Sequence, residues 1–257
     1  MPAELQSTSH GQTLVLTLSN PDLHNALEPA ICAAGIEALN GAERSPEVHS
    51  IIITGAAGIF STGGTPQRLL SSRLPDAQAQ SIDSLHNWIE TIRAYPKPVI
   101  AAVEGGAVDS GFSLALACDL IVAARSALFS IDCSRMALSP DGGASWSLAH
   151  AMPRPLATEL LLCGTGISAE RLQGLGVVNR LTEPGSALVA ALELAEELNT
   201  RAPNALTSAK ELLCEAQHQT LAFHLGTERS HFIKNLHHAN ADEGIRAFME
   251  KRPPRYR

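Results

Sequence analysis

Two glycine-rich stretches, each placed directly after a run of β-branched residues, are the part of the sequence best suited to chemistry. The first is TGAAGIFSTGG (54–64) and the second is EGGAVDSG (104–111). Glycine lets the backbone turn sharply and expose N–H groups, and the apolar run from Gly111 has a helix-like pattern, whose N-terminus attracts negative charge. Two such turns can aim their N–H groups at one oxygen. The pattern therefore predicts an oxyanion hole, although glycine after a strand also marks ordinary tight turns.

Motifs for other chemistries are missing from the sequence. It contains no G-x-G-x-x-G dinucleotide fingerprint, no phosphate loop of the G-x-x-x-x-G-K-[ST] type and no G-x-S-x-G nucleophile elbow. The ten histidines form no H-E-x-x-H pattern, and the five cysteines form no C-x-x-C pair. We therefore expect no metal site and no disulfide framework, and most cysteines are expected to be buried apolar side chains.

Composition narrows the class of protein further. The 257 residues carry a formal net charge of −7, which argues against nucleic acid or an anionic membrane as a partner. No segment has the uninterrupted apolar length of a transmembrane helix, and the N-terminus lacks the layout of a signal peptide. The expectation is a cytoplasmic protein whose 45% hydrophobic residues build one large domain, alone or with an appendage.

The elements that must position the glycine turns alternate between strand and helix. Helical spacing of Leu27, Ile31, Ala34 and Leu39 separates the first two strands, so the pattern predicts an α/β core. After Pro184 the strand pattern ends, and amphipathic helices are predicted instead. The predicted strands are 13–18, 50–54, 98–103, 119–124 and 177–181, and the predicted C-terminal helices are 186–202, 204–217 and 242–252.

The order of motifs along the chain resembles the crotonase, or enoyl-CoA hydratase/isomerase, superfamily. The resemblance covers essentially the whole chain and implies a crotonase (ClpP-like) spiral fold of repeated ββα units with a C-terminal helical appendage. It implies an acyl-CoA-binding core over 1–185 and a helical trimerisation region over 186–257, which would give a homotrimer or a dimer of trimers. The motifs are NPDLHNAL (20–27), IIITGAAGIFSTGG (51–64), the run 97–129, LSPDGGASWSL (138–148) and FMEKRPP (248–254).

This resemblance also implies a substrate and a mechanism. The substrate would be a coenzyme A thioester, so that coenzyme A enters with the substrate and no separate cofactor is expected. The chemistry would pass through an enolate whose charge rests on the thioester oxygen, held by the backbone amides that match Thr62 and Ser110. Loss of one donor from such a hole costs about 3 kcal/mol.

Contacts to coenzyme A are implied by the same motifs. Backbone groups of Ala26, Gly58, Phe60 and Gly63 would flank the adenine and pantetheine. Phe248 and Lys251 would close over the nucleotide, either within the chain or from a neighbouring subunit. A helix C-terminus with a charged last turn is the alternative interpretation of FMEKR.

The chain departs from the family pattern in its polar residues. Hydratases of the family use two glutamates, and the matching positions here hold Ser113 and Cys133, which disfavours an ordinary two-glutamate hydration. Asp109 stands where the family has glycine or another small residue, and an ionised carboxylate there would oppose enolate formation. We expect Asp109 to point outward; a raised pKa, or a contact with a polar acyl group or water, is the alternative.

Asp141 is the remaining candidate for a catalytic base. Its place in SPDGG resembles that of the aspartate of Δ3,Δ2-enoyl-CoA isomerases and of ring-opening enzymes, in which one base moves a proton between carbons. A surface β-turn explains the same residues without chemistry. The run around it most resembles the branch of alternative-type oxepin-CoA hydrolases, for which Trp146 could line the acyl site, although core packing is the expected role of this tryptophan.

Three hypotheses follow from these observations. The first is an acyl-CoA isomerase, hydratase or ring hydrolase that uses Asp141 as base with the amides of Thr62 and Ser110. The second is a crotonase-fold protein that binds acyl-CoA without converting it, in keeping with Ser113 and Cys133. The third is a structural subunit whose helices serve assembly.

Overall fold

The computed structural model describes residues 4–71 and 74–256, and a six-stranded sheet forms the centre of this part of the chain. Its strand order is β1-β2-β3-β4-β6-β9, and all neighbours are parallel except β1 and β2. The five predicted strands are confirmed, the last one shorter than expected, whereas β1 has a largely exposed and polar sequence without a strand pattern. The bounds are β1 Glu4–His10, β2 Thr13–Ser19, β3 Ser50–Gly55, β4 Val99–Val103, β6 Leu120–Ala124 and β9 Arg180–Thr182.

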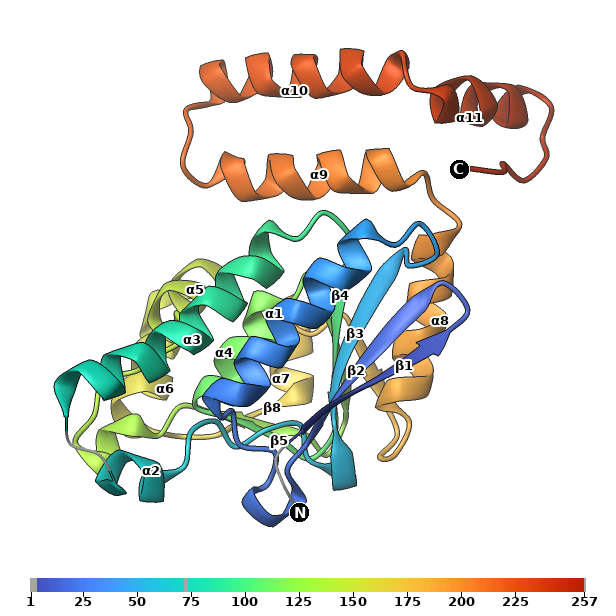
Figure 1. The fold of residues 1–257 in the computed structure, drawn as a ribbon. Coiled ribbons are helices and arrows are strands. Elements are labelled where there is room, and N and C mark those ends of the chain that lie inside the picture. The colour runs from blue at the N-terminus through green and yellow to red at the C-terminus, as the bar shows by residue number, and fades with distance from the viewer. Residues whose placement is uncertain (1–3, 72–73, 257) are drawn as a thin grey trace.

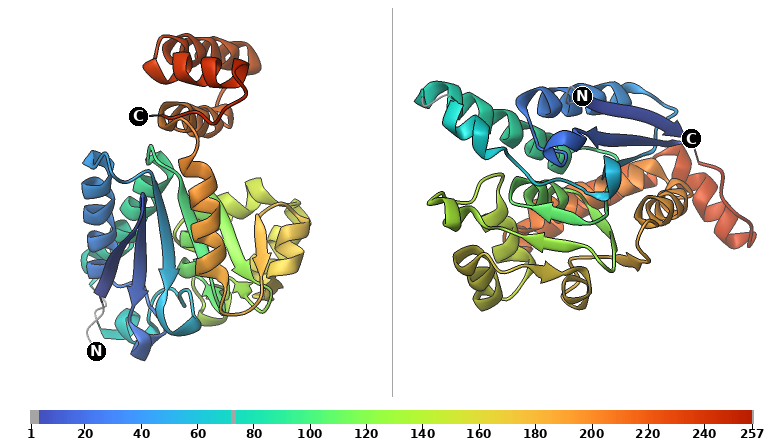
Figure 2. Two further views of the ribbon diagram at one scale, coloured as in Figure 1. Left: turned by 90° about the vertical axis from the view of Figure 1, so that its right-hand side faces the viewer. Right: turned by 90° about the horizontal axis from the view of Figure 1, so that it is seen from below.

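Both faces of this sheet are covered by helices, which explains its continuous apolar strands. Successive side chains of a strand point to opposite faces. Ile51 and Ile53 accordingly pack in the core beneath α1, α3 and α4, and Ile52 packs against α8 on the other face. Figure 2 shows α8 lying along that second face of the sheet. The bounds are α1 Pro29–Arg44, α3 Pro75–Ala94, α4 Ser110–Ala117 and α8 Ala187–Asn199.

A small second sheet completes the repeated ββα units. It consists of β5 (Gly106–Val108), β7 (Leu128–Ser130) and β8 (Ile167–Ser168). In one unit β4 leads into β5 and then α4, and a bridge between Ser61 and Ala107 places the segment after β3 alongside β5. These repeated units are the arrangement that the sequence predicts.

The five cysteines differ in exposure. Three of the five cysteines (Cys32, Cys118 and Cys133) are buried, which confirms the prediction for most of them, whereas Cys163 is exposed and Cys214 is half-buried.

The remaining elements of the core are short. They are η1 Pro21–Leu23, η2 Ala56–Gly58, α2 Pro66–Ser71, η3 Cys133–Met136, α5 Ala144–Ala151, α6 Arg154–Cys163 and α7 Ala169–Gly174.

Three C-terminal helices form a layer beyond the core (Figure 1). They are α9 (Pro203–Ala216), α10 (Leu221–Leu236) and α11 (Ala239–Met249). Lys210 of α9 donates to the carboxylate of Asp119 at 2.7 Å and so links this layer to the sheet. α8 buries Ala191 and Ala195 against the sheet and so packs with the core, whereas the boundary predicted after residue 185 groups it with the C-terminal helices.

Residues 4–71 and 74–256 contain neither a membrane-spanning helix nor a cluster of metal-binding side chains. No helix in this part of the chain has both the length and the apolar character needed to cross a membrane. The same residues bring together no group of three or more His, Cys, Asp or Glu side chains that could hold a metal ion.

Candidate active site

A cavity of about 130 Å³ lies where α2, the first half of α3 and the N-terminus of α4 meet. It brings together two predicted site residues, Ser110 and Asp141, which are 31 residues apart in the chain. Its wall combines aliphatic side chains with a few polar groups, as ligand sites generally do. The lining residues are Leu27, Gly64, Thr65, Arg68, Leu69, Ala77, Gln78, Ser81, Ile82, Leu85, Ser110 and Asp141.

Asp141 is held in this cavity by two serines of α4. Ser110 Oγ donates to Asp141 Oδ1 at 2.7 Å, and Ser113 Oγ donates to the Asp141 carbonyl at 3.0 Å. Gly142 follows with φ +59°, and a Cβ at this position would lie 2.9 Å from that of Ser113. The SPDGG turn, which contains Asp141, therefore packs tightly against α4, and Asp141 is half-buried beside the start of that helix.

The two glycine turns meet at Gly63 and Ser110. A Cβ added to Gly63 would lie 2.9 Å from the Ser110 nitrogen, so only glycine allows this approach. The Ser110 N–H, at the first position of α4, donates to none of the described residues, and neither does the N–H of Gly64, which lines the cavity. The meeting turns thus supply two amides that can serve a ligand oxygen.

The Thr62 amide does not have the role expected of it. Its N–H donates to the His24 carbonyl at 3.2 Å, and Thr62 does not line the cavity. This corrects the expectation that Thr62 is the first donor, because an amide already bonded inside the protein is not available to a ligand. The available N–H is that of Gly64, two residues further along the same loop. The paired glycines at 63–64 were the feature of the sequence that could have indicated it.

Asn25 positions the first loop and was missed by sequence reasoning. Its side chain is buried and accepts the Asn20 N–H at 3.0 Å. It donates to the Ala56 carbonyl at 2.8 Å and to the Ile59 carbonyl at 2.7 Å. This one amide therefore joins the segment before α1 to the loop that carries Gly64.

Replacement of Asn25 by alanine is expected to lower the free energy of unfolding by about 2–4 kcal/mol. The change leaves the buried Asn20 N–H and two partly buried carbonyl groups without their partner, at up to about 1–3 kcal/mol each. Alanine also tolerates the φ of +58° less well than asparagine does. Urea denaturation followed by circular dichroism measures the change. The exposed Gln173→Ala, in α7, serves as control and should stay within about 0.5 kcal/mol of wild type; an equal loss in both variants would contradict this role.

Asp109 differs from the prediction that it points outward. Its Oδ1 accepts the Asp132 N–H at 2.7 Å and the Cys133 thiol at 3.3 Å, so the carboxyl is turned into the protein. Burial raises the pKa of the Asp109 carboxyl above its ordinary value, and the nearby charges of Asp141 and Asp132 act in the same direction. Burial likewise raises the pKa of the Cys133 thiol to about 12.

The backbone at Asp109 is strained. Its φ of +48° and ψ of −121° lie in a region that suits glycine and that other residues rarely adopt. Such a conformation costs about 1–3 kcal/mol and persists only where the surroundings enforce it. Here the Asp109 N–H donates to the Ser130 carbonyl at 2.8 Å, which fixes the residue at the end of β5.

The fold places the residues implied for coenzyme A in two separate regions, the loops of the core and the C-terminal helices. Ala26, Phe60 and Gly63 are buried in the loops next to the cavity, and the Gly63 carbonyl accepts the Leu27 N–H at 2.8 Å. Gly58 is exposed on the same side. Their role towards coenzyme A stays a prediction.

Phe248 and Lys251 lie far from this cavity within one chain. They belong to α11 and the residues just after it, in the layer at the opposite end of the molecule from α2 (Figure 1). The Phe248 side chain is 85% exposed. Contact with the nucleotide of this site would therefore have to come from a neighbouring subunit.

Trp146 does not line the cavity either. It is half-buried, its ring lies 4.1 Å from the His150 ring, and the Arg93 guanidinium stacks on it at 4.4 Å. Trp146 is therefore neither part of the cavity wall nor fully packed in the core.

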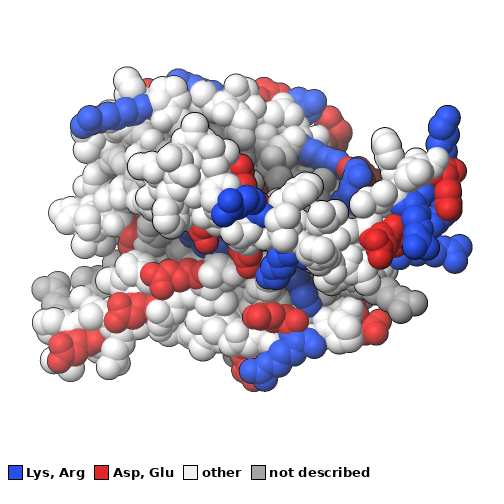
Figure 3. All heavy atoms as spheres, turned by 90° about the horizontal axis from the view of Figure 1, so that it is seen from above, with Lys and Arg blue, Asp and Glu red and all other residues white. Residues whose placement is uncertain are grey.

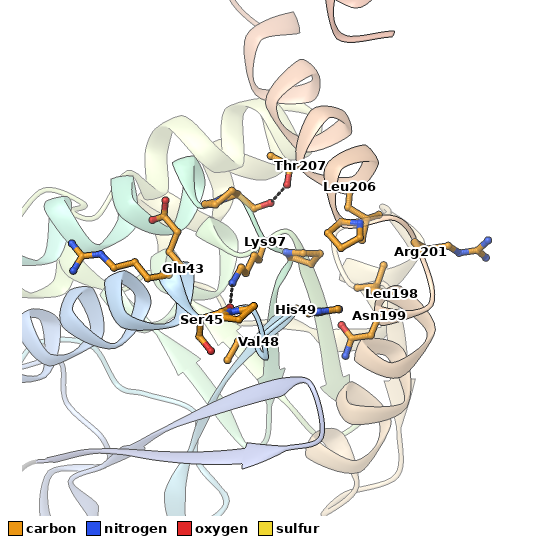
Figure 4. Close-up of a pocket in the computed structure, with 15 residues that line it drawn as sticks. Glu43, Ser45, Val48, His49, Lys97, Leu198, Asn199, Arg201, Leu206 and Thr207 are labelled. Carbon is orange, nitrogen blue, oxygen red and sulfur yellow. Dashed lines mark hydrogen bonds between the residues drawn. The ribbon is translucent and has the colours of Figure 1, made fainter. Parts of the chain in front are cut away.

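A second, larger cavity of about 310 Å³ opens between the core and α9 (Figure 4). Residues that precede β3 and β4, among them Ser45 and Lys97, line it, so it lies at the strand ends opposite Ser110. Lys97 Nζ donates to the carbonyls of Ala42 and Ser45 at 2.6 and 2.9 Å, which satisfies the last turn of α1. This lysine therefore has a structural role.

Comparison with known proteins confirms the fold and the family that the sequence motifs predict. The family model described as enoyl-CoA hydratase/isomerase matches residues 9–257. The chain is 34% identical to a putative enoyl-CoA hydratase of Thermus thermophilus, over 96% of this chain and 98% of that protein. It is 31% identical to the 2,3-dehydroadipyl-CoA hydratase of Escherichia coli, over 99% of both chains. The crystal structure of an enoyl-CoA hydratase from Polaromonas sp. JS666 has 59% identity and a TM-score of 0.97, covering 98% of this chain and 99% of that one.

Proposed function

Because the chain belongs to the enoyl-CoA hydratase/isomerase family, which acts on CoA thioesters, we propose that it converts an enoyl-CoA thioester through an enolate, with Asp141 as the base. One observation carries the proposal. The Asp141 carboxylate, fixed by Ser110 Oγ at 2.7 Å, shares a cavity with two amides that have no acceptor among the described residues.

The amides of Gly64 and Ser110 form the oxyanion hole in this proposal. Negative charge develops on the thioester oxygen when the enolate forms, and N–H groups fixed beforehand stabilise it without reorganisation. The Ser110 N–H also has the positive end of α4 behind it. The aliphatic wall of Leu27, Ile82 and Leu85 would take the acyl chain.

Asp141 takes a proton from the carbon next to the thioester carbonyl and can return it two carbons further along the chain. That sequence converts a 3-enoyl thioester into a 2-enoyl thioester and needs no second reactant, so one carboxylate suffices. Hydration and ring opening pass through the same enolate but also require a bound water. Among the three outcomes, isomerisation fits best, because Asp141 is the one carboxylate among the described residues that line the cavity.

A second candidate is a protein that binds acyl-CoA without turnover. Ser113 and Cys133 support it, because they hold the positions of the two hydratase glutamates and neither is a base here. Ser113 Oγ donates to the Asp141 carbonyl at 3.0 Å, and the pKa of the Cys133 thiol is raised to about 12.

Exchange of carbon-bound hydrogen with deuterated water separates these functions. The protein is incubated with 3-enoyl-, 2-enoyl- and oxepin-type CoA esters, and products are followed by mass spectrometry. We expect deuterium at C2 of the 3-enoyl ester and its conversion to the 2-enoyl ester. Binding of the esters without exchange or product would establish the non-catalytic function instead, and absence of binding would contradict both.

We further propose that the chain assembles through α9–α11 into a homotrimer or a dimer of trimers. α10 has no buried residue, and Figure 3, which looks down on this layer, shows mostly uncharged atoms with charged groups mixed among them. Large apolar side chains exposed there need a partner surface. They are Leu213, Leu221, Phe223, Leu225, Phe232, Ile233, Leu236, Ile245, Phe248 and Met249.

Assembly is tested by the mass in solution. Light scattering should give about three or six times the chain mass of 27.2 kDa. Phe232→Glu, which places a charge on the exposed face of α10, should lower that mass and raise KM for the CoA ester, because Phe248 and Lys251 can reach the site only from a neighbour. A monomeric wild type would contradict the proposal.

A further inference from the structure

Asp109 is a second carboxyl group beside Ser110, and the function proposed above gives it no role. It directly precedes Ser110 in the chain, and the Ser110 hydroxyl is bonded to Asp141. A Cβ on Gly63 would lie 2.9 Å from the Ser110 nitrogen and 3.2 Å from Asp109 Cβ. The Asp109 side chain therefore begins beside the two turns that form the proposed oxyanion hole, next to the cavity rather than in its lining, and Asp141 is among its charged neighbours.

The two oxygens of Asp109 have different surroundings. Oδ1 accepts from the Asp132 N–H and from the Cys133 thiol. Oδ2 has no hydrogen bond to any described residue, and it is not among the fully buried oxygens. Because the lone pairs of Oδ1 are occupied, a proton on this carboxyl group sits on Oδ2, which can donate it.

The position of this carboxyl group is maintained against backbone strain. Glycine would adopt φ +48° and ψ −121° without cost, yet the chain places an aspartate there. Strain of this kind gathers at functional sites, where the surroundings hold a group in place. The Ser130 carbonyl and the Asp132 N–H fix the backbone and the side chain of Asp109 respectively.

Resting on the proposed function, we propose that Asp109 is a second proton-transfer residue. Asp141 removes a proton from C2 of a 3-enoyl-CoA thioester, and Asp109 delivers a different proton from Oδ2 to C4. The electrons of the broken C2–H bond form the dienolate, whose charge rests on the thioester oxygen. As the C4–H bond forms, the O–H bond of Asp109 breaks and the 2-enoyl thioester results. Asp141 is then protonated and Asp109 ionised, and exchange with water restores both.

The surroundings favour the protonated form that this step requires. The titratable groups near Asp109 are Asp132, Asp141 and the thiol of Cys133, and none of them is a cation. Arg135 pairs with Asp132 at 3.2 Å and lies on the exposed side of it. The raised pKa of Asp109 gives the sign of the pH dependence: isomerisation slows as pH rises through that pKa, because the ionised form has no proton to give.

The test separates proton removal at C2 from proton delivery at C4. Wild type, Asp109→Asn and Asp109→Gly are compared with a 3-enoyl-CoA ester in deuterated water, and mass spectrometry and NMR locate the deuterium. Asparagine preserves the size of the side chain, and glycine suits the backbone conformation, so a folding defect in one variant leaves the other to decide. Asp109→Glu, which retains an acid, is the rescue variant.

We expect Asp109→Asn and Asp109→Gly to exchange the C2 hydrogens but to form the 2-enoyl ester at least 100-fold more slowly than wild type, with KM nearly unchanged. Asp109→Glu should recover part of the rate, and the decline at high pH should vanish in Asp109→Asn. Full isomerisation by Asp109→Asn and Asp109→Gly would overturn the inference. Loss of C2 exchange as well as of isomerisation would also overturn it. C2 exchange that persists in Asp141→Asn would instead contradict the proposed function.

Discussion

Asp141→Asn is expected to lower kcat by about 10²–10⁴-fold, the usual contribution of a positioned acid–base group, and to leave KM nearly unchanged. Asparagine has the same shape and can still accept the Ser110 hydroxyl, so the cavity that contains both residues should retain its form. What is lost is the ability to take a proton. C2 exchange in deuterated water should fall with kcat, because both depend on this step.

The control for this variant is Asp83→Asn. Asp83 is an exposed residue of α3 that does not line the cavity, so the same change of charge there should leave kcat within about twofold of wild type. Steady-state kinetics of both variants gives the comparison. Retention of kcat in Asp141→Asn would show that another group is the base.

Ser110→Pro, compared with Ser110→Ala, is expected to lower kcat by about 10²–10³-fold, the effect of losing one oxyanion donor. Both variants lose the hydroxyl that bonds Asp141, but only proline lacks the backbone N–H. Ser110 is the first residue of α4, so proline removes no hydrogen bond of the helix, but its ring would crowd Gly63 and restrict Asp109, and a lower stability is expected as well. Alanine alone should cost about tenfold or more, since a hydrogen bond to a charged carboxylate contributes about 1.5–3 kcal/mol.

Urea midpoints of the two Ser110 variants serve as control, because the kinetic comparison holds only where both proteins are folded. Equal kcat values in the folded variants would show that the Ser110 amide does not hold the thioester oxygen. Thr62→Ala offers a further contrast. Its amide is occupied by the His24 carbonyl, and alanine keeps that hydrogen bond, so little change in kcat is expected.

Sequence alone predicted five strands of the large sheet but none of the small one, because only β-branched runs between helices give a clear strand pattern. The ordered motifs predicted the family and its spiral fold. They also drew attention to the loop 54–64 and to Ser110 and Asp141, since glycine and Pro-Asp-Gly-Gly turns at strand ends are local signals. β1 was missed because its side chains are polar and exposed. α8 was assigned to the appendage because a helical pattern does not say what the helix packs against.

Only the tertiary structure decided which groups face the cavity. A backbone N–H has no side chain to mark its direction, so the choice between Thr62 and Gly64 depended on the His24 carbonyl. The orientation of Asp109 depended on Asp132 and Cys133, which a separate strand brings to it. Patterns along the chain determine elements, whereas hydrogen-bond partners are set by contacts between distant segments, and these determine what each group can do.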